Sequence, residues 1–319
     1  MIGIPTPLAA KSPGWIGDFA WRNGRVVVRK TGVSLAIDRH LIAEIVSWLI
    51  YLPLLGTFAL AARLRRQRRF AIWYAPDLPR PWYLMRGVAL WAGLSVAPTE
   101  ASANAAFYFD DVTRGNPLAT LVLPRFNFAC PDVSKSHVAE VFAEVFGYPL
   151  QLDPVMASGP IVEKSETNGV HDGSVVVAPV TPQPGRVYQR LIDTEADGFN
   201  HDLRTPCVGG APVIVWHKYK PAGESFAIHS RRTRLRDPAD VFSVDELALI
   251  RRFNARMGLD WGGLDILRDR HDGRIYVVDV NKTDLGPVIS LSWRDKIISM
   301  NRLAAALEVM VTSGTVPGD

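Results

Sequence analysis

Two segments near the carboxyl end, Asp260–Asp269 and Arg274–Asn281, constrain the fold more than any other feature. The second segment is rich in valine and isoleucine, and His271-Asp272-Gly273 between the two is typical of a hairpin turn. Side chains alternate along a strand, so Asp279 and Asn281 point to one face of the predicted sheet. We therefore expect a hairpin that carries an acid and an amide on the same face.

Asp265 lies on the first strand of this hairpin, fourteen residues before Asp279. Three oxygen-bearing side chains, those of Asp265, Asp279 and Asn281, can therefore converge on one side of a sheet. Mg²⁺ prefers such ligands and is commonly completed by nucleotide phosphates rather than by a full protein cage. The pattern predicts a phosphate-bearing ligand. The alternative is that Asp279 and Asn281 merely cap the strand and begin a turn.

The size and composition of the chain fit a globular protein of two or three lobes. It has 319 residues, of which 48% are hydrophobic and 21% charged, and its net charge is +4. A positive charge suits nucleic acid, anionic lipid or a phosphorylated ligand. The basic runs lack interleaved aromatic residues, which leaves nucleic acid as the least supported partner. Cys130 and Cys207 predict two buried thiols in a reducing compartment.

An apolar run, Ile45–Ala62, forms most of a helix expected over residues 41–62. Its eighteen residues carry no charge, and an arginine-rich stretch over 63–69 follows. The length reaches the threshold for a membrane span, but Pro53 and Gly56 interrupt the middle. Three alternatives stay open: a span, a helix lying in the bilayer surface, and a helix buried in the first lobe or in a homodimer interface. Because residues 1–14 lack a secretory signal, we expect a cytoplasmic protein, with attachment to the inner face of the membrane left open.

Hydrophobic periodicity predicts an α/β fold with an open-sheet lobe at the amino-terminal end. We expect three lobes, over 1–127, 128–195 and 196–319. Strands are predicted over 24–30, 69–75, 105–112, 159–165, 173–180, 186–192 and 209–220, and helices over 81–93, 134–147, 245–258 and 292–313.

Lysines and glycines in the middle of the chain suggest phosphate binding. Lys164 ends an apolar strand, and Gly169 and Gly173 follow in a polar turn. A positive charge beside exposed backbone N–H groups suits phosphate oxygens, although many hairpins carry Gly and Lys. The next strand reads as a hinge whose backbone, with Gln189 and Leu191, would recognise the edge of adenine.

Taken in order, these pieces resemble the ATP-grasp superfamily over Asp132–Gly286. The resemblance implies an ATP-grasp fold whose two carboxyl-terminal lobes clasp ATP, with ATP and Mg²⁺ as cofactors. It implies the following roles: phosphate lysines at Lys135 and Lys164; an adenine and ribose hinge at Gln189, Leu191, Ile192 and Asp193, with Glu195 as the alternative for ribose; a catalytic Arg204 on a D-x-R strand; and Mg²⁺ ligands at Asp265, Asp279 and Asn281.

The resemblance further implies a basic residue near the γ-phosphate. Lys218 and a catalytic Lys220 are the first candidates, with Arg231 and Arg232 as alternatives. The sequence departs from the family's pattern here, because the segment over 217–237 replaces one that normally ends in an asparagine and a glycine pair. A glutamate is also usual where Asp279 stands, and the glycine-rich loop is thin. His229 as a catalytic base competes with an ordinary packed or solvated histidine.

ATP-grasp enzymes mostly transfer a phosphoryl group from ATP to a carboxylate, and an amine or thiol then captures the acyl phosphate. The resemblance therefore implies a ligase, with carbon–nitrogen bond formation the leading reaction and an acceptor that is membrane- or sugar-linked as one option. Two alternatives stay open. One is a kinase that phosphorylates a hydroxyl group of a lipid or sugar, and the other is a membrane-associated nucleotide-binding module without turnover.

Overall fold

The structure is a computed structural model, and its contacts divide the chain into two compact units, residues 1–49 and 50–319. The predicted boundaries at 127/128 and 195/196 fall inside the second unit and stay a prediction. His229 lies outside the described residues. These are residues 17, 19–22, 24–28, 34–65, 70–117, 119–120, 122, 124–170, 172–223 and 230–313.

The first unit holds a small antiparallel sheet in the order β1-β2-β3. Its strands are β1 (Phe19–Arg22), β2 (Arg25–Val28) and β3 (Ser34–Ala36), and β2 is the strand predicted over 24–30. Helix α1 (Arg39–Arg65) begins here and continues into the second unit, so the helix predicted over 41–62 is confirmed, with Pro53 inside it.

The second unit opens with a parallel sheet in the order β5-β4-β6-β7. The strands are β5 (Ser95–Val96), β4 (Ala71–Pro76), β6 (Ala105–Phe109) and β7 (Arg125–Phe126), and α2 (Leu84–Trp91) and the short helix η2 (Glu100–Ser102) connect them. All five residues of β6 are buried, as a central parallel strand requires. The long helix α5 (Trp293–Ser313) packs on α2, and the Trp91 indole N–H donates to Asn301 Oδ1 at 2.8 Å.

A second, three-stranded antiparallel sheet has the order β10-β8-β9. It consists of β8 (Gly159–Ser165), β9 (Ser174–Ala178) and β10 (Arg186–Arg190), which confirms the strands predicted there. Its core is small and centres on Ile161, Ala178 and Tyr188. We call this sheet with its turns the three-stranded lobe.

The largest sheet is seven-stranded, and its main path runs β15-β14-β12-β16-β17. These strands are β15 (Arg232–Arg236), β14 (Val215–Pro221), β12 (Phe199–Val208), β16 (Trp261–Arg268) and β17 (Ile275–Asn281); the short β11 (Glu195–Ala196) and β13 (Ala211–Pro212) pair with β12, and the turn η3 (Pro238–Asp240) follows β15. The single strand predicted over 209–220 is wrong in one respect. The chain breaks at Val213 and Ile214, so it forms β13 and β14 as two separate strands.

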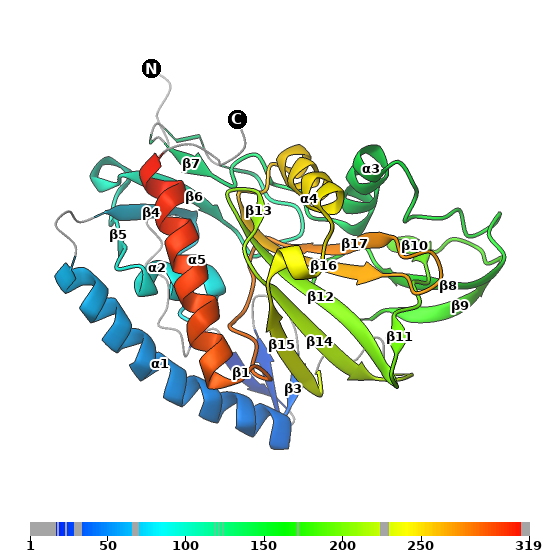
Figure 1. Cartoon of the computed structure of the whole chain (residues 1–319), viewed down its shortest axis with the longest axis horizontal. Helices are drawn as coiled ribbons and strands as arrows, with labels where there is room; N and C mark the ends of the chain where they lie inside the picture. Colours follow the sequence, from blue (N-terminus) through cyan, green and yellow to red (C-terminus); the bar gives the residue numbers. More distant parts are fainter. Residues whose placement is uncertain are drawn as a thin grey trace. The chain divides into compact units, whose positions relative to one another are not determined.

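Helices α3 (Lys135–Phe146) and α4 (Val244–Met257) cover one face of this sheet beside β16 and β17, as Figure 1 shows. Their apolar faces and the inward residues of the sheet form an extensive hydrophobic core, which we call the large core. α4 begins with a capping box between Ser243 and Glu246. α3 ends at Gly147, whose φ of 79° is a left-handed conformation that glycine adopts without strain.

Candidate functional site

The register of the large sheet places Arg204, Asp265 and Asp279 side by side. Arg204 on β12 lies opposite Asp265 on β16, and Asp265 lies opposite Asp279 on β17. Asn281 is two residues further along β17, and its amide N–H donates to Asp265 Oδ2 at 3.5 Å. The structure therefore brings the three predicted metal ligands and the predicted arginine together, on the face of the sheet that α3 and α4 leave uncovered.

Arg204 is held between two carboxylates. Its Nη1 donates to Asp265 Oδ2 at 2.6 Å, and its Nη2 pairs with Asp284 Oδ1. Asp284 is 3% exposed and was not predicted from the sequence. A Cβ on Gly263 would collide with the Asp284 carboxylate and lie 3.0 Å from Arg204 Nε. Glycine at 263 thus makes room for this buried ion pair.

A β-bulge in the hairpin gives Lys164 its partner. The register between β16 and β17 shifts after Asp265, so Val278 has no opposite residue on β16. β17 is also the last strand of its sheet, and its outer carbonyls need other donors. Lys164 Nζ donates to the Val278 carbonyl at 2.9 Å, and the Asn168 amide donates to the Val280 carbonyl at 3.1 Å. The three-stranded lobe therefore closes this edge of the large sheet with side chains.

Lys135 reaches the same edge from a third direction. It is the first residue of α3, it is 5% exposed, and its Nζ donates to Asn168 Oδ1 at 2.7 Å and to Asp279 Oδ1. The two predicted phosphate lysines, Lys135 and Lys164, thus meet at Asp279. Asn168 was missed, because an asparagine in a polar turn carries no signal of its own in a single sequence.

Burial and neighbouring charges shift the pKa values of this cluster. Burial lowers the pKa of Lys164 to about 8, although Asp279 opposes the shift. Burial acts to raise the pKa of Asp265, but Arg204 and Lys218 outweigh it and hold that pKa well below its usual range. Asp265 is thus a carboxylate at any physiological pH.

Arg204, Asp265 and Asp279 form a row of charged side chains across three strands, which we call the charged row. Lys218 and Lys220 on β14 extend this row. They face the same side as Arg204, because Lys218 pairs with Asp202 and Lys220 with Asn200 on β12. Lys220 Nζ lies 2.6 Å from Asp202 Oδ2. Burial lowers the pKa of Lys218, against the attraction of Asp265.

The two alternative γ-phosphate arginines lie elsewhere. The Arg232 guanidinium sits 4.2 Å from the centre of the Tyr219 ring, on the opposite face of the sheet from Lys218. The Arg231 backbone N–H donates to the Tyr219 carbonyl at 2.9 Å. Arg232 is therefore not part of the charged row, and no contact between described residues joins Arg231 to that row.

Of the predicted hinge residues, Gln189 lies on β10, beside the strand that carries Lys164, and Leu191, Ile192 and Asp193 follow the end of β10. Gln189 pairs with Val162, and its buried Nε2 has no hydrogen-bond partner in the described part of the chain. Leu191 is half-buried, whereas Ile192 belongs to the large core. Gln189 therefore belongs to the same lobe as Lys164, whereas Ile192 packs in the large core.

The two candidates for ribose occupy different settings. Asp193 pairs with Arg270 at 2.7 Å and with His271 at 3.2 Å. Burial acts to raise the pKa of Asp193, but the Glu195 backbone N–H and the two basic neighbours lower it. Glu195 itself is exposed on β11. The Asp193 carboxylate is thus already engaged with basic side chains of the hairpin turn, whereas that of Glu195 faces solvent.

The donor set suits a hard cation that takes further ligands from another molecule. The described residues contain no group of three or more His, Cys, Asp or Glu placed to hold a metal. Asp265, Asp279 and Asn281 supply two carboxylates and an amide oxygen, all hard oxygen donors. The nearby Asp284 Oδ2 is buried and has no hydrogen-bond partner within the described ranges. Carboxylates and ammonium groups at one edge can together bind a magnesium–polyphosphate.

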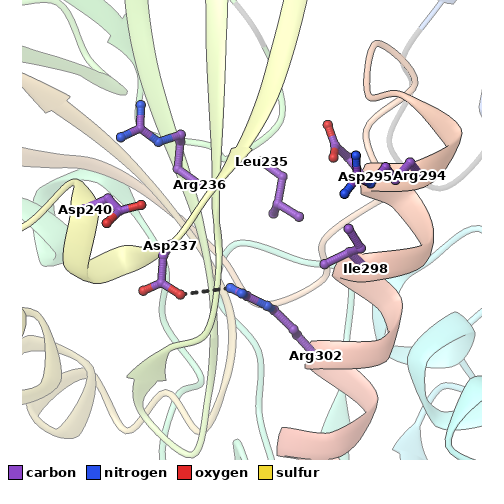
Figure 2. A pocket seen from close by; sticks show the side chains of 8 residues that line it. All are labelled: Leu235, Arg236, Asp237, Asp240, Arg294, Asp295, Ile298 and Arg302. Atoms are coloured by element: carbon purple, nitrogen blue, oxygen red, sulfur yellow. Dashed lines mark hydrogen bonds and ion pairs between the residues drawn. The ribbon is translucent and has the colours of Figure 1, made fainter.

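A cavity of about 290 Å³ lies elsewhere, between β15, η3 and α5, and shares no residue with this cluster (Figure 2). Three arginines and three aspartates line it with Leu235 and Ile298, and Arg302 Nη1 pairs with Asp237 Oδ2 at 3.0 Å. The lining therefore carries equal numbers of positive and negative side chains.

Comparisons with known proteins return matches at the level of structure only. No family model and no curated protein matches the chain. The ATP-grasp ligase PsnB, in complex with a phosphomimetic variant of its minimal precursor, Mg and ADP, matches over 76% of this chain and 98% of its own, at 13% identity and a TM-score of 0.49. D-alanine–D-alanine ligase from Bacillus anthracis, complexed with ATP, matches over 77% and 97%, at 13% identity and 0.46.

A third match is a RimK domain ATP-grasp protein from Sphaerobacter thermophilus. It covers 76% of this chain and 98% of its own, at 14% identity and a TM-score of 0.45. All three solved structures are ATP-grasp proteins, the superfamily that the sequence motifs resemble. Similarities this remote assign no activity, so a functional assignment has to rest on the side chains of this chain.

Proposed function

We propose that this chain is an ATP-grasp ligase that activates an acceptor carboxylate as an acyl phosphate, which an amine or thiol then captures. One observation carries the proposal: two lysines and three oxygen donors from four separate elements meet at the edge of β17. These residues also follow the order of the ATP-grasp motifs along the chain. An ion-pair network that served only stability would need charge balance, but it would not need its residues in that order.

The lysines hold the nucleotide in this proposal. Lys164 and Lys135 donate to phosphate oxygens. Their Nζ atoms contact neighbouring residues of β17, since Lys164 donates to the Val278 carbonyl and Lys135 donates to the Asp279 carboxylate. Asp265, Asp279 and Asn281 hold Mg²⁺, which supplies neutralisation of the β- and γ-phosphate charge when bound. The β10 strand with Gln189 offers an adenine hinge in the same lobe.

Arg204 meets the charge that develops on the transferred phosphoryl group. Its guanidinium is already fixed by Asp265 and Asp284, so little reorganisation is needed during reaction. In the first step the bond between the γ-phosphorus and the bridging oxygen breaks, a bond from γ-phosphorus to a carboxylate oxygen forms, and ADP leaves. In the second step the amine or thiol attacks the carbonyl carbon, inorganic phosphate leaves, and the nucleophile loses its proton.

The acceptor needs no general base in the first step. A carboxylate is ionised at neutral pH, so it is already a nucleophile. Lys218 and Lys220, which line the same face as Arg204, are suited to orient the acceptor carboxylate or the γ-phosphate. We place the reaction in the cytoplasm, where ATP is available and where two free thiols stay reduced.

The test is ADP formation by the purified chain with Mg-ATP, pools of candidate acids and pools of amines and thiols, followed by mass spectrometry of the products. We expect ADP formation that needs Mg²⁺, an acid and a nucleophile together. Arg204→Ala should abolish most of it, and the matched control Arg234→Ala, on an exposed position of β15, should not. A separate arm supplies a pool of hydroxyl compounds: a stable phosphorylated hydroxyl product would replace the ligase with a kinase, and no Mg-dependent ADP with any pool would refute both.

A further inference from the structure

Helix α1 is apolar on all its sides, which is unusual for a helix at a protein surface. Between residues 41 and 62 its only charged side chain is Glu44. An eighteen-residue window within Leu41–Leu64 has a mean hydropathy of 1.9, and the stretch meets the length of a membrane span. A surface helix of a globular protein normally carries polar residues on the face opposite its buried stripe. What α1 presents outward therefore needs an explanation.

One stripe of α1 is packed against the rest of the second unit. Tyr51, Leu55 and Ala59 are 3%, 2% and 7% exposed. Phe58 stacks on Trp91 of α2 with ring centres 3.9 Å apart, and the Tyr51 hydroxyl donates to the Met300 sulfur of α5 at 3.3 Å. This side of α1 is therefore packed against α2 and α5, so lipid cannot surround the helix.

The opposite stripe is apolar and exposed. Successive helical residues are about 100° apart, which puts Ile50, Leu60 and Leu64 on the side facing away from Tyr51 and Leu55. These three side chains are 52%, 60% and 78% exposed. Isolated exposed hydrophobic residues are ordinary, but three large ones on the same side of one helix mark a candidate interaction surface, although the small Gly56 and the polar Thr57 lie between Ile50 and Leu60.

The charges at the end of the helix indicate which partner covers this stripe. Five arginines occur between 63 and 69, directly after the apolar run, and no acidic residue stands among them. An apolar helix that is followed along the chain by a basic stretch matches the boundary between acyl chains and anionic headgroups of a bilayer. A second copy of the chain would bring an identical set of arginines to the interface and has no acidic partner for them in this stretch.

We propose that α1 docks in the plane of an anionic lipid bilayer, with Ile50, Leu60 and Leu64 entering the headgroup boundary and the Tyr51–Leu55 stripe remaining on the protein. The packing against α2 and α5 selects this orientation over a membrane span. The inference concerns where the chain works and is independent of the proposed ligase activity.

The first test is co-sedimentation of the full chain with vesicles of phosphatidylcholine alone or with added phosphatidylglycerol. We expect binding to the anionic vesicles that weakens as salt is raised. The double variant L60E/L64E should reduce partitioning about tenfold or more, because two leucines no longer leave water. The matched control M156E, at a residue that is 81% exposed and outside α1, should bind like the wild type. Equal binding by L60E/L64E, or no vesicle binding by the wild type, overturns the proposal.

The second test measures depth. Cys130 and Cys207 are buried, so a single cysteine introduced at Leu60 can carry an environment-sensitive fluorophore. We expect a blue shift of its emission on anionic vesicles, and no shift for the same label at Met156. The emission is instead blue-shifted already in the absence of lipid if a second copy covers position 60. If L60E/L64E then turns a dimer into a monomer, and the wild type binds no vesicles, the covering partner is a second copy and the proposal is wrong.

Discussion

The three-stranded lobe and the seven-stranded sheet meet at β17, yet they are held together in different ways. The sheet has a core to which β12, β14, β16, β17, α3 and α4 all contribute. The core cluster of the lobe has three members, Ile161, Ala178 and Tyr188, and Val177 is 71% exposed on its outer strand. Hydrophobic burial therefore stabilises the sheet strongly and the lobe weakly.

The lobe is attached to the sheet through polar contacts that involve the candidate site itself. Lys164 and Asn168 bond the outer carbonyls of β17, and Lys135 joins Asn168 to Asp279. In the proposed function both lysines must bind phosphate. The seven-stranded sheet with α3 and α4 therefore supplies a rigid part, which we call the frame. The three-stranded lobe is attached to this frame by side chains that, in the proposed function, also bind the ligand.

The sharpest test of this contrast compares one core substitution in each part. Leu264→Ala should lower the free energy of unfolding by about 2–5 kcal/mol, because Leu264 is fully buried in the large core. Ile161→Ala should cost less than Leu264→Ala, since its small cluster has half-buried neighbours that can collapse into the space. Chemical denaturation monitored by circular dichroism measures both, with Val177→Ala as a control. Equal losses at positions 264 and 161 would remove the contrast.

The two parts should also fail differently in catalysis. Arg204→Ala should lower kcat by on the order of 10²–10³, because a fixed transition-state donor is lost from the frame. Lys164→Ala should mainly raise the KM for ATP, because it holds the nucleotide. Asp284→Asn should lower kcat less than Arg204→Ala does, since Arg204 keeps its bond to Asp265. Steady-state ADP formation separates these outcomes. A pure KM effect for Arg204→Ala would contradict its role.

Much of the frame was predictable from the sequence, and the contacts across it were not. The β16–β17 hairpin and helices α3 and α4 follow from periodicity, turns and glycine stops. β15 was missed because Arg232, Arg234 and Arg236 give it no apolar alternation. Asp284 and Asn168 were missed because their roles depend on register and a bulge that link distant segments. Alternation along a strand predicts on which face of the sheet a side chain lies, but it does not predict which residue from a distant segment will contact that side chain.

A histidine on the other face of the frame supplies a pH test of its stability. Burial, with His201 and nearby arginines, lowers the pKa of His217 to about 4, while the unfolded chain keeps the ordinary value. Between about pH 6.5 and 4 the unfolded state therefore binds the proton and the native state does not, so stability falls as pH falls, by at most about 3 kcal/mol. His217→Gln should flatten this part of the curve of unfolding free energy against pH. The exposed control His271→Gln should retain the slope, and an unchanged slope in His217→Gln would contradict the prediction.

The smallest expected effect is a difference in local opening. Backbone amides of β8, β9 and β10 should exchange hydrogen at least about tenfold faster than those of β12 and β16, because the lobe can open without disrupting the large core. Hydrogen exchange read by mass spectrometry measures this directly. Uniform protection across both sheets would mean that they unfold as one unit.

Calorimetric titration with a non-hydrolysable ATP analogue tests most directly whether the edge of β17 is one magnesium–nucleotide site. We predict binding by the wild type that requires Mg²⁺, and affinities at least about tenfold weaker for Lys164→Ala and for the isosteric Asp279→Asn. Val177→Ala should bind like the wild type. Binding that ignores Mg²⁺ and survives both substitutions, or no binding by the wild type, would contradict the assignment.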